Sequence, residues 1–483
     1  MVRYKMSKRM RKAVIVLFWL IVWQIAAMRM DNQILLVGPV RVLQTLVQNI
    51  LQPDFLKIVL HSFVRIGLGF FTALIAGLIL GAVSYRFPIA EEVSAPVMAA
   101  LKSIPVASFV VLLLIWFGSS KLSLLVSFLI VFPNVYVNTI SGLKSVDIKL
   151  KEMARVFGMG TTARLMYIYR PALMPYMNSC LKISLGMSWK SGIAAEVIGL
   201  PDYSMGERLY MSKIYLDTAG LFSWTLLIVL VSFLFEKAVL KFMKVLGEWK
   251  PYPMPAAGGN KTAVSAETAG TVQISHIDKS YGESSVLQDF SLTMEEGQRY
   301  LLMAPSGTGK TTLLRILTGL DSADEGTITG MPLHAGMVFQ EDRLCEEYDA
   351  VCNIMLGMGR GGIKDRKSSG QDMSRAQLAD FVRKEASAIL PADCLTKPVK
   401  ELSGGMRRRV AFLRAVLSAS DFLILDEPFA GLDEENRVLS AAYLLGHLDG
   451  RTLVATTHRE DDVELLKGVK VTLVFSKSLC YNA

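Results

Sequence analysis

The amino-acid sequence predicts two domains of different class: an all-α membrane domain with about six spans over residues 1–250, then an α/β domain over residues 272–483. Three observations support this division. The 483 residues exceed the usual size of one compact domain. Long apolar runs occupy the first half, whereas short β-rich runs alternate with helical ones from Val272 onward. The formal charge changes sign, from +15 in residues 1–250 to −6 in residues 251–483, which gives the net +9.

Composition excludes several classes of protein. Hydrophobic residues make up 52% and charged residues 20%, so the chain is neither disordered nor fibrous. Nucleic-acid binding would also explain the positive charge, but that charge stands beside long apolar runs, which favours basic loops at a membrane and no nucleic-acid partner. The five cysteines form no CxxC pair and are expected to be free thiols in a reducing compartment: Cys180, Cys345, Cys352, Cys394 and Cys480.

The first expected span is Ala13–Met28, which follows a basic N-terminus. Basic residues before an apolar run predict a cytoplasmic N-terminus, although a cleaved signal peptide is the alternative. Five further spans are expected at Val64–Val83, Ala95–Phe117, Leu122–Ile140, Leu173–Ile198 and Leu221–Leu240. Six spans place the C-terminal domain in the cytoplasm, at the inner face of the plasma membrane. The basic loop after the fourth span agrees with this topology, with Lys144, Lys149, Lys151, Arg155, Arg164 and Arg170.

The fifth expected span carries Lys182, Lys190 and Glu196. Charged side chains at such depth cost about 2.5–3.5 kcal/mol each on insertion scales, so they mark a water-filled path or the interior of a helix bundle. Lys190 and Glu196 are therefore candidate residues of a transport path. Alternatively, Lys190 and Glu196 pair with each other, and Lys182 only extends to the interface.

The loop after the fourth span contains Glu152-Met-Ala154, Gly158 and, after nine intervening residues, Ile168-Tyr-Arg-Pro171. The pattern predicts a short helix over Lys149–Val156 that ends at Gly158, with Pro171 opening the next span. The loop, near 149–171, resembles the EAA loop of binding-protein-dependent ABC importer permeases, with Met153 and Arg170 as departures. The alternative is a generic basic interfacial helix. The run Glu152–Gly199, with "LKSIP" at 101–105 and "WFG" at 116–118, resembles the nitrate/sulfonate/taurine branch. The resemblance implies that Glu152, Ala154 and Gly158 belong to a coupling loop.

Residues 251–271 carry no apolar periodicity and are expected to form a flexible linker. Beyond them, the strand Leu301–Met303 runs into a phosphate-binding loop and a helix. In this order, loop amides surround phosphate, Lys310 reaches the β- and γ-phosphates, and the Thr311 hydroxyl ligates Mg²⁺. Ala304 stands where the motif usually has its first glycine, and its β-carbon could crowd the loop. The expected nucleotide-binding residues are Ser306, Gly307, Thr308, Gly309, Lys310, Thr311 and Thr312.

A second apolar strand, Phe422–Asp426, ends in two carboxylates. Its apolar residues predict burial on both faces. Asp426 at the strand's end can hold Mg²⁺, and Glu427 can polarise an attacking water molecule. Together with the phosphate loop, this strand predicts a nucleotide hydrolase.

Leu402-Ser-Gly-Gly-Met406 precedes this strand and resembles the signature motif of ABC ATPases, with Met406 in place of glutamine. In that family, the residues corresponding to Ser403, Gly404 and Gly405 cap the γ-phosphate bound by the opposite subunit. The resemblance also assigns Gln340 to the Q-loop, as a catalytic residue and a Mg²⁺ ligand, and His458 to the switch histidine. Asp433 corresponds to the D-loop and Tyr281 to the aromatic residue that stacks on adenine. Arg407–Arg409 are expected to lie on a solvated helix face.

The two halves together resemble an importer permease fused to its ATPase. The expected function is ATP-driven import of a small solute, such as a sulfonate, nitrate or vitamin-precursor heterocycle, with ATP and Mg²⁺ as cofactors. The resemblance implies a homodimer in membrane lipid and an extracytoplasmic solute-binding protein as partner. The alternatives are an exporter half-transporter and a nucleotide-binding membrane sensor that does not transport.

Overall fold

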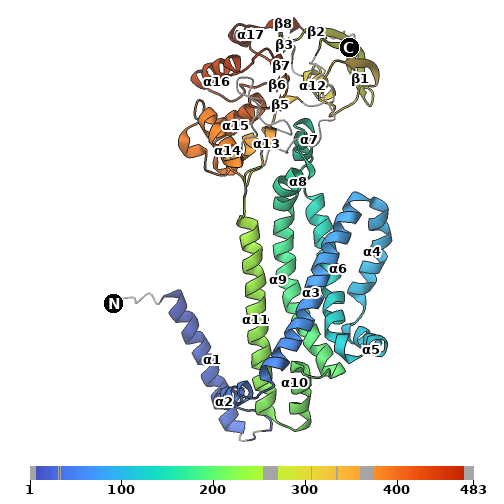
Figure 1. Cartoon of the computed structure of the whole chain (residues 1–483), viewed down its shortest axis with the longest axis vertical. Coiled ribbons are helices and arrows are strands. Elements are labelled where there is room, and N and C mark those ends of the chain that lie inside the picture. The colour runs from blue at the N-terminus through green and yellow to red at the C-terminus, as the bar shows by residue number, and fades with distance from the viewer. Residues whose placement is uncertain are drawn as a thin grey trace, which may run out of the picture. The chain divides into compact units, whose positions relative to one another are not determined.

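A computed structural model describes residues 7–30, 32, 34–253, 270–305, 307–332, 335–358 and 374–472 (Figure 1). The chain forms two compact units. The first holds Met1–Ser145 and Ala172–Trp249, and the second holds Val146–Pro171 and Lys250–Ala483. The segment 146–171, expected to connect two spans, therefore belongs to the same unit as the phosphate loop.

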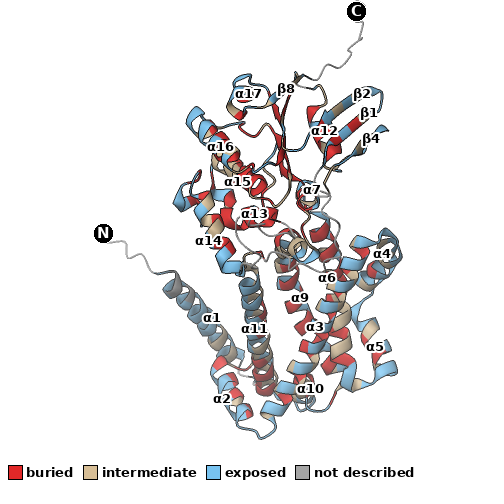
Figure 2. Ribbon diagram, turned by 45° about the horizontal axis from the view of Figure 1, so that its top comes forward, coloured by how far each residue is buried: buried red, intermediate tan, exposed pale blue. Residues whose placement is uncertain are grey.

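The first unit is all-α in its described residues. Its core is an apolar cluster to which α2, α3, α6, α9, α10 and α11 contribute, with Phe70, Leu181 and Trp189 almost completely buried. Figure 2 shows α1 as exposed along most of its length, and an exposed apolar helix suits contact with lipid. The helices are α1 (Lys8–Met30), α2 (Pro39–Ile50), α3 (Phe55–Arg86), α4 (Pro88–Ser103), α5 (Val106–Phe117), α6 (Leu122–Lys144), α9 (Arg170–Gly199), α10 (Met205–Ile214) and α11 (Thr218–Glu248).

Four described helices are long and apolar enough to cross a membrane: α1, α3, α6 with its preceding turn, and α11. The third expected span is not one straight helix, because α4 and α5 meet at a bend of 103°. Pro105 lies at this break, where it cannot donate a helical hydrogen bond and disfavours helical backbone at Ile104. If the bent pair is one span, the described spans number five. The fifth expected span is α9. Its polar residues make it less apolar than the four helices named above, so it is not among the helices that are apolar enough to cross a membrane.

Helices α3 and α6 pack closely along glycines of α3. A β-carbon at Gly69 would lie 2.3 Å from the carbonyl oxygen of Leu124, and one at Gly81 would lie 2.7 Å from Cβ of Thr139. Both distances are far below van der Waals contact. Small residues at these positions therefore allow the two backbones to approach, as is common where helices pack in lipid.

The second unit contains two sheets. An antiparallel sheet has the order β2-β1-β4, and a parallel sheet has the order β5-β6-β7-β3-β8. The strands are β1 (Val272–Tyr281), β2 (Ser284–Met294), β3 (Arg299–Met303), β4 (Glu325–Thr329), β5 (Gly336–Val338), β6 (Phe422–Asp426), β7 (Thr452–Thr457) and β8 (Val469–Thr472). The helices are α7 (Ile148–Val156), α8 (Thr161–Arg164), α12 (Lys310–Leu317), α13 (Ala350–Gly357), α14 (Arg375–Ala386), α15 (Gly404–Val416), α16 (Glu434–Gly446) and α17 (Asp461–Leu466).

The parallel sheet explains where functional residues gather. Strands β6 and β7 are buried along their whole length, as their apolar sequences require. Because β5, β6, β7 and β3 are parallel neighbours, their carboxyl ends lie at one edge of the sheet. This edge is the usual place for ligands in an open α/β sheet.

We predict that Gly69→Ala destabilises the first unit, because the carbonyl oxygen of Leu124 belongs to a packed helix and cannot move aside cheaply. Overpacking of this kind costs about 1–3 kcal/mol. The matched control is Gly186→Ala on α9, where a β-carbon would meet nothing within 4 Å. Thermal unfolding of both variants in detergent should show a lower Tm for Gly69→Ala alone. Equal Tm values would contradict the close packing of α3 and α6.

Candidate nucleotide site and coupling segment

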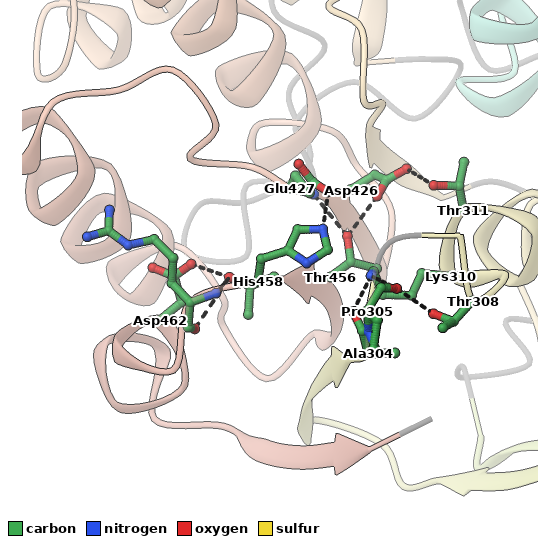
Figure 3. Close-up of polar contacts among 12 residues, drawn as sticks. Ala304, Pro305, Thr308, Lys310, Thr311, Asp426, Glu427, Thr456, His458 and Asp462 are labelled. Carbon is green, nitrogen blue, oxygen red and sulfur yellow. Dashed lines mark hydrogen bonds and ion pairs between the residues drawn. The ribbon is translucent and has the colours of Figure 1, made fainter. Parts of the chain in front are cut away.

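The site lies at the carboxyl edge of the parallel sheet. Residues 304–310 follow β3, and His458 follows β7. Asp426 ends β6, where it pairs in register with Thr456 of β7. Figure 3 shows that the side chains of Lys310, Asp426 and His458 converge from these three strand ends.

The phosphate loop is built by glycines and a lysine. Gly307 and Gly309 have φ of +81° and +85°, and a β-carbon at Gly309 would lie 2.8 Å from Cγ1 of Val286. Lys310 begins α12 and donates from Nζ to the carbonyl oxygens of Ala304 at 2.5 Å and Pro305 at 3.0 Å. Burial lowers the pKa of Lys310. Ser306 lies outside the described residues.

The alanine at position 304 does not adopt a left-handed backbone. Ala304 is absent from the described residues with positive φ, so its β-carbon requires no left-handed backbone. Its carbonyl oxygen still receives the Lys310 ammonium. Crowding of the phosphate loop by the Ala304 β-carbon stays a prediction.

Asp426 is almost completely buried between two hydroxyl groups. Thr311 Oγ1 donates to Oδ2 at 3.0 Å, and Thr456 Oγ1 donates to Oδ1 at 2.7 Å. Burial raises the pKa of Asp426, an effect that the two hydroxyl hydrogen bonds oppose. The oxygen atoms of Thr311 and Asp426 are the hard ligands that Mg²⁺ prefers.

This donor set fits Mg²⁺ together with a nucleotide. Among the described residues, no group of three or more His, Cys, Asp or Glu side chains could hold a metal without further ligands. Mg²⁺ is commonly bound through one carboxylate plus substrate phosphates and water, so the single carboxylate of Asp426 is sufficient. The open space around Gly307 and the ammonium of Lys310 suit phosphate beside it.

Glu427 has a left-handed backbone, with φ of +48°. Such a conformation costs roughly 1–3 kcal/mol in a residue other than glycine, and residues that keep it concentrate at functional sites. The amide of Glu427 donates to Thr456 Oγ1 at 3.0 Å, and its carboxylate Oε1 lies 2.8 Å from His458 Nε2. Thr457 and Arg459 help to line a cavity of about 100 Å³ that Glu427 and His458 border. The pair could therefore orient one carboxylate oxygen toward a water molecule.

The other expected nucleotide residues lie at separate places in the unit. Gln340 is exposed just beyond β5. Tyr281 ends β1 with an exposed ring, and its hydroxyl donates to Asp321 Oδ2 at 2.5 Å. The hydroxyl of Tyr281 also interacts with the Thr312 side chain.

The signature residues stand at a helix start. Ser403 caps α15 by accepting from the Met406 amide at 3.4 Å, and Gly404 and Gly405 form its first turn. In the described part of the chain, they make no hydrogen bond to the phosphate loop. Asp433 is exposed and caps α16 through the Asn436 amide. The signature residues and Asp433 therefore stand at the starts of two different helices, α15 and α16.

Arg408 is a structural residue that sequence reasoning missed. It is 4% exposed, so the expectation of a solvated face is wrong at this position. Its guanidinium donates to the carbonyl oxygens of Phe339, Asp426 and Glu427 at 2.6–2.7 Å. Arg408 therefore ties α15 to both the Gln340 loop and the end of β6. In the sequence, only the run of three arginines indicates this position. The carbonyl acceptors could belong to any residue, so they leave no pattern from which the contacts of Arg408 can be predicted.

The predicted short helix is present as α7, Ile148–Val156. Asp147 caps its start by accepting from the Lys149 amide at 2.9 Å. At its end, Gly158 has φ of +61°, the Gly158 amide donates to Arg155 O, and the Met159 amide donates to Ala154 O. This is the Schellman arrangement, which explains why the helix ends at a glycine.

Glu152 on α7 binds two arginines of the ATP-binding half. Its Oε1 accepts from Arg315 at 2.8 Å, and its Oε2 accepts from Arg343 at 2.6 Å. Arg315 belongs to α12, directly after the phosphate loop, and Arg343 lies three residues after Gln340. Hydrogen bonding from Arg315 is the largest cause that lowers the pKa of Glu152, so the carboxylate remains charged at neutral pH.

Arg343 is itself held in place. Its φ is +47°, and its guanidinium stacks 4.0 Å above the ring of Phe339. Its carbonyl oxygen accepts from Arg414 at 2.7 Å. Arg414 on α15 is completely buried, and its guanidinium lies 5.2 Å from the ring of Phe157 at the end of α7. The guanidinium groups of Arg343 and Arg414 therefore connect the Gln340 loop with α7 and α15.

The candidate transport-path residues do not pair with each other. Lys190 is exposed on α9, whereas Glu196 is buried and accepts from Ser62 Oγ at 2.7 Å and from the Gly206 amide at 3.2 Å. Residues six apart on a helix face different sides, which explains the separation. The interpretation that Lys190 and Glu196 pair with each other is therefore wrong.

Two family profiles match the chain. The profile described as ABC transporter matches residues 287–430, and the profile described as binding-protein-dependent transport system inner membrane component matches residues 73–243. A relative named aliphatic sulfonates import ATP-binding protein SsuB 3, from Rhodococcus jostii, is 34% identical over 220 residues, which cover 44% of this chain and 76% of the relative.

A second relative, named Nod factor export ATP-binding protein I, from Sinorhizobium fredii, is 34% identical over 207 residues. That match covers 40% of this chain and 57% of the relative, so the chain spans little more than half of its length. A solved dimeric ATP-binding cassette with bound ADP and phosphate is 27% identical, with a TM-score of 0.36, and the match covers 42% of this chain and 94% of that one.

The sequence matches fall on both halves of the polypeptide, and the sulfonate-import relative is covered over three quarters of its length. The chain therefore belongs to the ABC transporter family, and it joins a binding-protein-dependent permease and an ATP-hydrolysing domain in one polypeptide.

Proposed function

We propose that the chain imports a small solute across the cytoplasmic membrane at the expense of ATP, as a homodimer that receives solute from an extracytoplasmic binding protein. The observation that carries this proposal is the pairing of Glu152 with Arg315 and Arg343. It joins a segment between two membrane helices, α6 and α9, to α12, which follows the phosphate loop, and to the loop that contains Gln340 and Arg343. Such a contact is what an ATPase needs in order to act on a permease.

In the proposed hydrolysis, Lys310 and the amides of the phosphate loop hold the β- and γ-phosphates. Thr311, Asp426 and Gln340 are the proposed ligands of Mg²⁺, which when bound would neutralise phosphate charge. Glu427 accepts a proton from the attacking water, and His458 orients its carboxylate. Tyr281 is proposed to stack on the adenine.

The homodimer follows from the proposed role of the signature residues. Ser403, Gly404 and Gly405 lie at the positive end of α15, a ready site for phosphate. One chain carries one permease and one ATPase, so a second copy would supply the opposing signature motif. Closure of two such ATP sites would move the two α7 helices and bias the membrane helices between two states.

Small organic anions are the proposed substrates. The sulfonate-import relative supports this choice, as does Lys190, a cation exposed on α9. Export is the second candidate, because relatives of similar identity are named for Nod factor export. Sealed membrane vesicles that contain the protein separate the two: ATP-dependent accumulation of labelled taurine from the binding-protein side supports import. ATP-dependent extrusion supports export.

The binding-protein partner has its own test. The proposal expects uptake to fall to background when the solute-binding protein that co-purifies with this chain is deleted from cells. Full uptake without that protein would contradict this part of the proposal.

We predict that Glu427→Gln lowers ATP turnover by about 10²–10⁴-fold, since general-base catalysis contributes that much. Nucleotide binding should persist, because Lys310 and the phosphate loop are unchanged. Phosphate release and binding of a fluorescent ATP analogue measure the two effects. Glu435→Gln, an exposed residue at the start of α16, is the matched control. If the wild type has no turnover and Glu427→Gln changes nothing, the non-transporting sensor is favoured.

We predict that Glu152→Gln uncouples hydrolysis from the permease while ATP turnover continues. The variant removes the carboxylate charge that binds Arg315 and Arg343. The Arg343 side chain, which is only 11% exposed, then has lost its ionic partner, and an uncompensated charge in such a setting is costly. Met187→Cys, at an exposed position of α9 in a chain whose native cysteines are replaced by alanine, reports on the permease through labelling by a membrane-impermeant maleimide. Its ATP-dependent labelling change should shrink by about fivefold or more.

Lys149→Gln is the matched control for Glu152→Gln. Lys149 is on the same helix as Glu152, and the variant removes its ion pair with Glu341 in the loop after β5. Both side chains are about half exposed, and exposed pairs contribute little. Its labelling change should equal that of the parent. An equal loss in both variants would show that α7 charge in general, not the Glu152 contact, controls coupling.

A further inference from the structure

The segment Lys250–Pro253 lies two residues beyond α11 and belongs to the ATP-binding unit. Residues 251–253 are the start of the expected flexible linker, of which residues 254–269 lie outside the described chain. In the structure, Pro253 is buried and Tyr252 is partly buried. The end of the last membrane helix is therefore followed at once by a bound segment.

Tyr252 and Lys250 bind a short stretch of the ATP-binding domain. Tyr252 donates from its hydroxyl to Asp349 Oδ2 at 3.0 Å and accepts from Arg383 at 3.1 Å, whose guanidinium also lies 5.4 Å from its ring. Lys250 donates to the carbonyl oxygen of Glu347. Hydrogen bonds of Lys250 and Tyr252 therefore hold the segment on the ATP-binding domain.

The same stretch receives the segment that precedes α9. Tyr348, which is 2% exposed, donates from its hydroxyl to Met166 O at 3.0 Å and packs edge-on against Tyr167 at 5.1 Å. Burial raises the pKa of Tyr348 to about 12, so the hydroxyl keeps its proton. Tyr167 in turn donates to Pro251 O at 2.7 Å. Two segments that continue into membrane helices therefore meet at Tyr348.

From Tyr348 the contacts lead to the signature motif. Residues 346–349 bind the 3₁₀ helix Val399–Glu401, which precedes Leu402. The Val399 amide donates to Tyr348 O at 2.9 Å, and the Lys400 amide donates to Glu346 O at 3.3 Å. An isolated bridge joins Asp349 and Pro398. This route is separate from the Glu152 contact, which leads to the phosphate loop and the Gln340 loop.

We propose that Lys250–Pro253 is a second coupling element, through which the end of the last membrane helix acts on Tyr348 and Asp349 and so on the signature helix. The inference rests on the proposed transport function. It assigns the junction between the fused domains a role in coupling, whereas a tether would only keep the two domains in one chain.

Two identical insertions separate these roles. Gly-Ser-Gly-Ser between Trp249 and Lys250 slackens the junction before the bound segment. The same insertion between Gly258 and Gly259 lengthens the chain after it. Both are made in the full-length Met187→Cys reporter in lipid nanodiscs, and ATP turnover is measured alongside labelling.

The inference expects the first insertion to reduce the ATP-dependent labelling change by about fivefold or more, while ATP turnover continues and the second insertion behaves like the parent. Tyr252→Phe, which removes one hydroxyl and keeps the ring, should reduce it roughly two- to tenfold. Equal behaviour of the two insertions would overturn the inference.

If the first insertion does not fold, Tyr252→Phe decides, and an unchanged labelling response overturns the inference. A parent that hydrolyses ATP but shows no labelling change would contradict the transport mechanism itself, and the second coupling element with it. Failure of the transport proposal is therefore distinguishable from failure of this inference alone.

Discussion

The structure of the ATP-binding unit depends on one carboxylate, Glu152, held between the guanidinium groups of Arg315 and Arg343. Three local features make this contact possible. Asp147 and Gly158 fix the two ends of α7, and the left-handed backbone of Arg343 points its side chain at α7. The contact is largely withdrawn from water, and an ion pair in that setting is costly to break. It connects the segment between α6 and α9 with α12, directly after the phosphate loop, and with the loop that contains Gln340 and Arg343.

Buried arginines extend this contact through the rest of the unit. Arg414 donates to the carbonyl oxygen of Arg343 and lies against the ring of Phe157. Arg408 donates to the carbonyl oxygens of Phe339, next to Gln340, and of Asp426, at the carboxyl end of β6. Both arginines belong to α15, which begins at the signature residues. A displacement of α7 would therefore reach Asp426, Glu427 and the signature helix through hydrogen bonds to backbone carbonyls. Because these groups are buried, each bond is expensive to lose without replacement.

Sequence reasoning predicted the parts of this arrangement that leave a local pattern. The strand before Ala304, the buried strand that ends at Asp426 and the glycine that ends α7 all follow from short-range rules. The partners of Arg408 could not be predicted, because carbonyl acceptors carry no residue identity. The separation of Lys190 from Glu196 could not be predicted, because it depends on which side of α9 packs inward. The sequence predicted one straight span over Ala95–Phe117, whereas the structure has two helices that meet at a bend at Pro105. Residues 251–253 resembled linker because proline-rich composition does not reveal a docked aromatic ring.

The central claim is that Glu152 transmits ATP-driven change to the permease through Arg315. A double-mutant cycle with Glu152→Gln and Arg315→Gln tests this transmission, with the ATP-dependent labelling of the Met187→Cys reporter in nanodiscs as the measurement. The account predicts strong non-additivity, because either single change already breaks the contact; coupled residues commonly show about 0.5–3 kcal/mol of interaction energy. Additive effects of the two substitutions would contradict it.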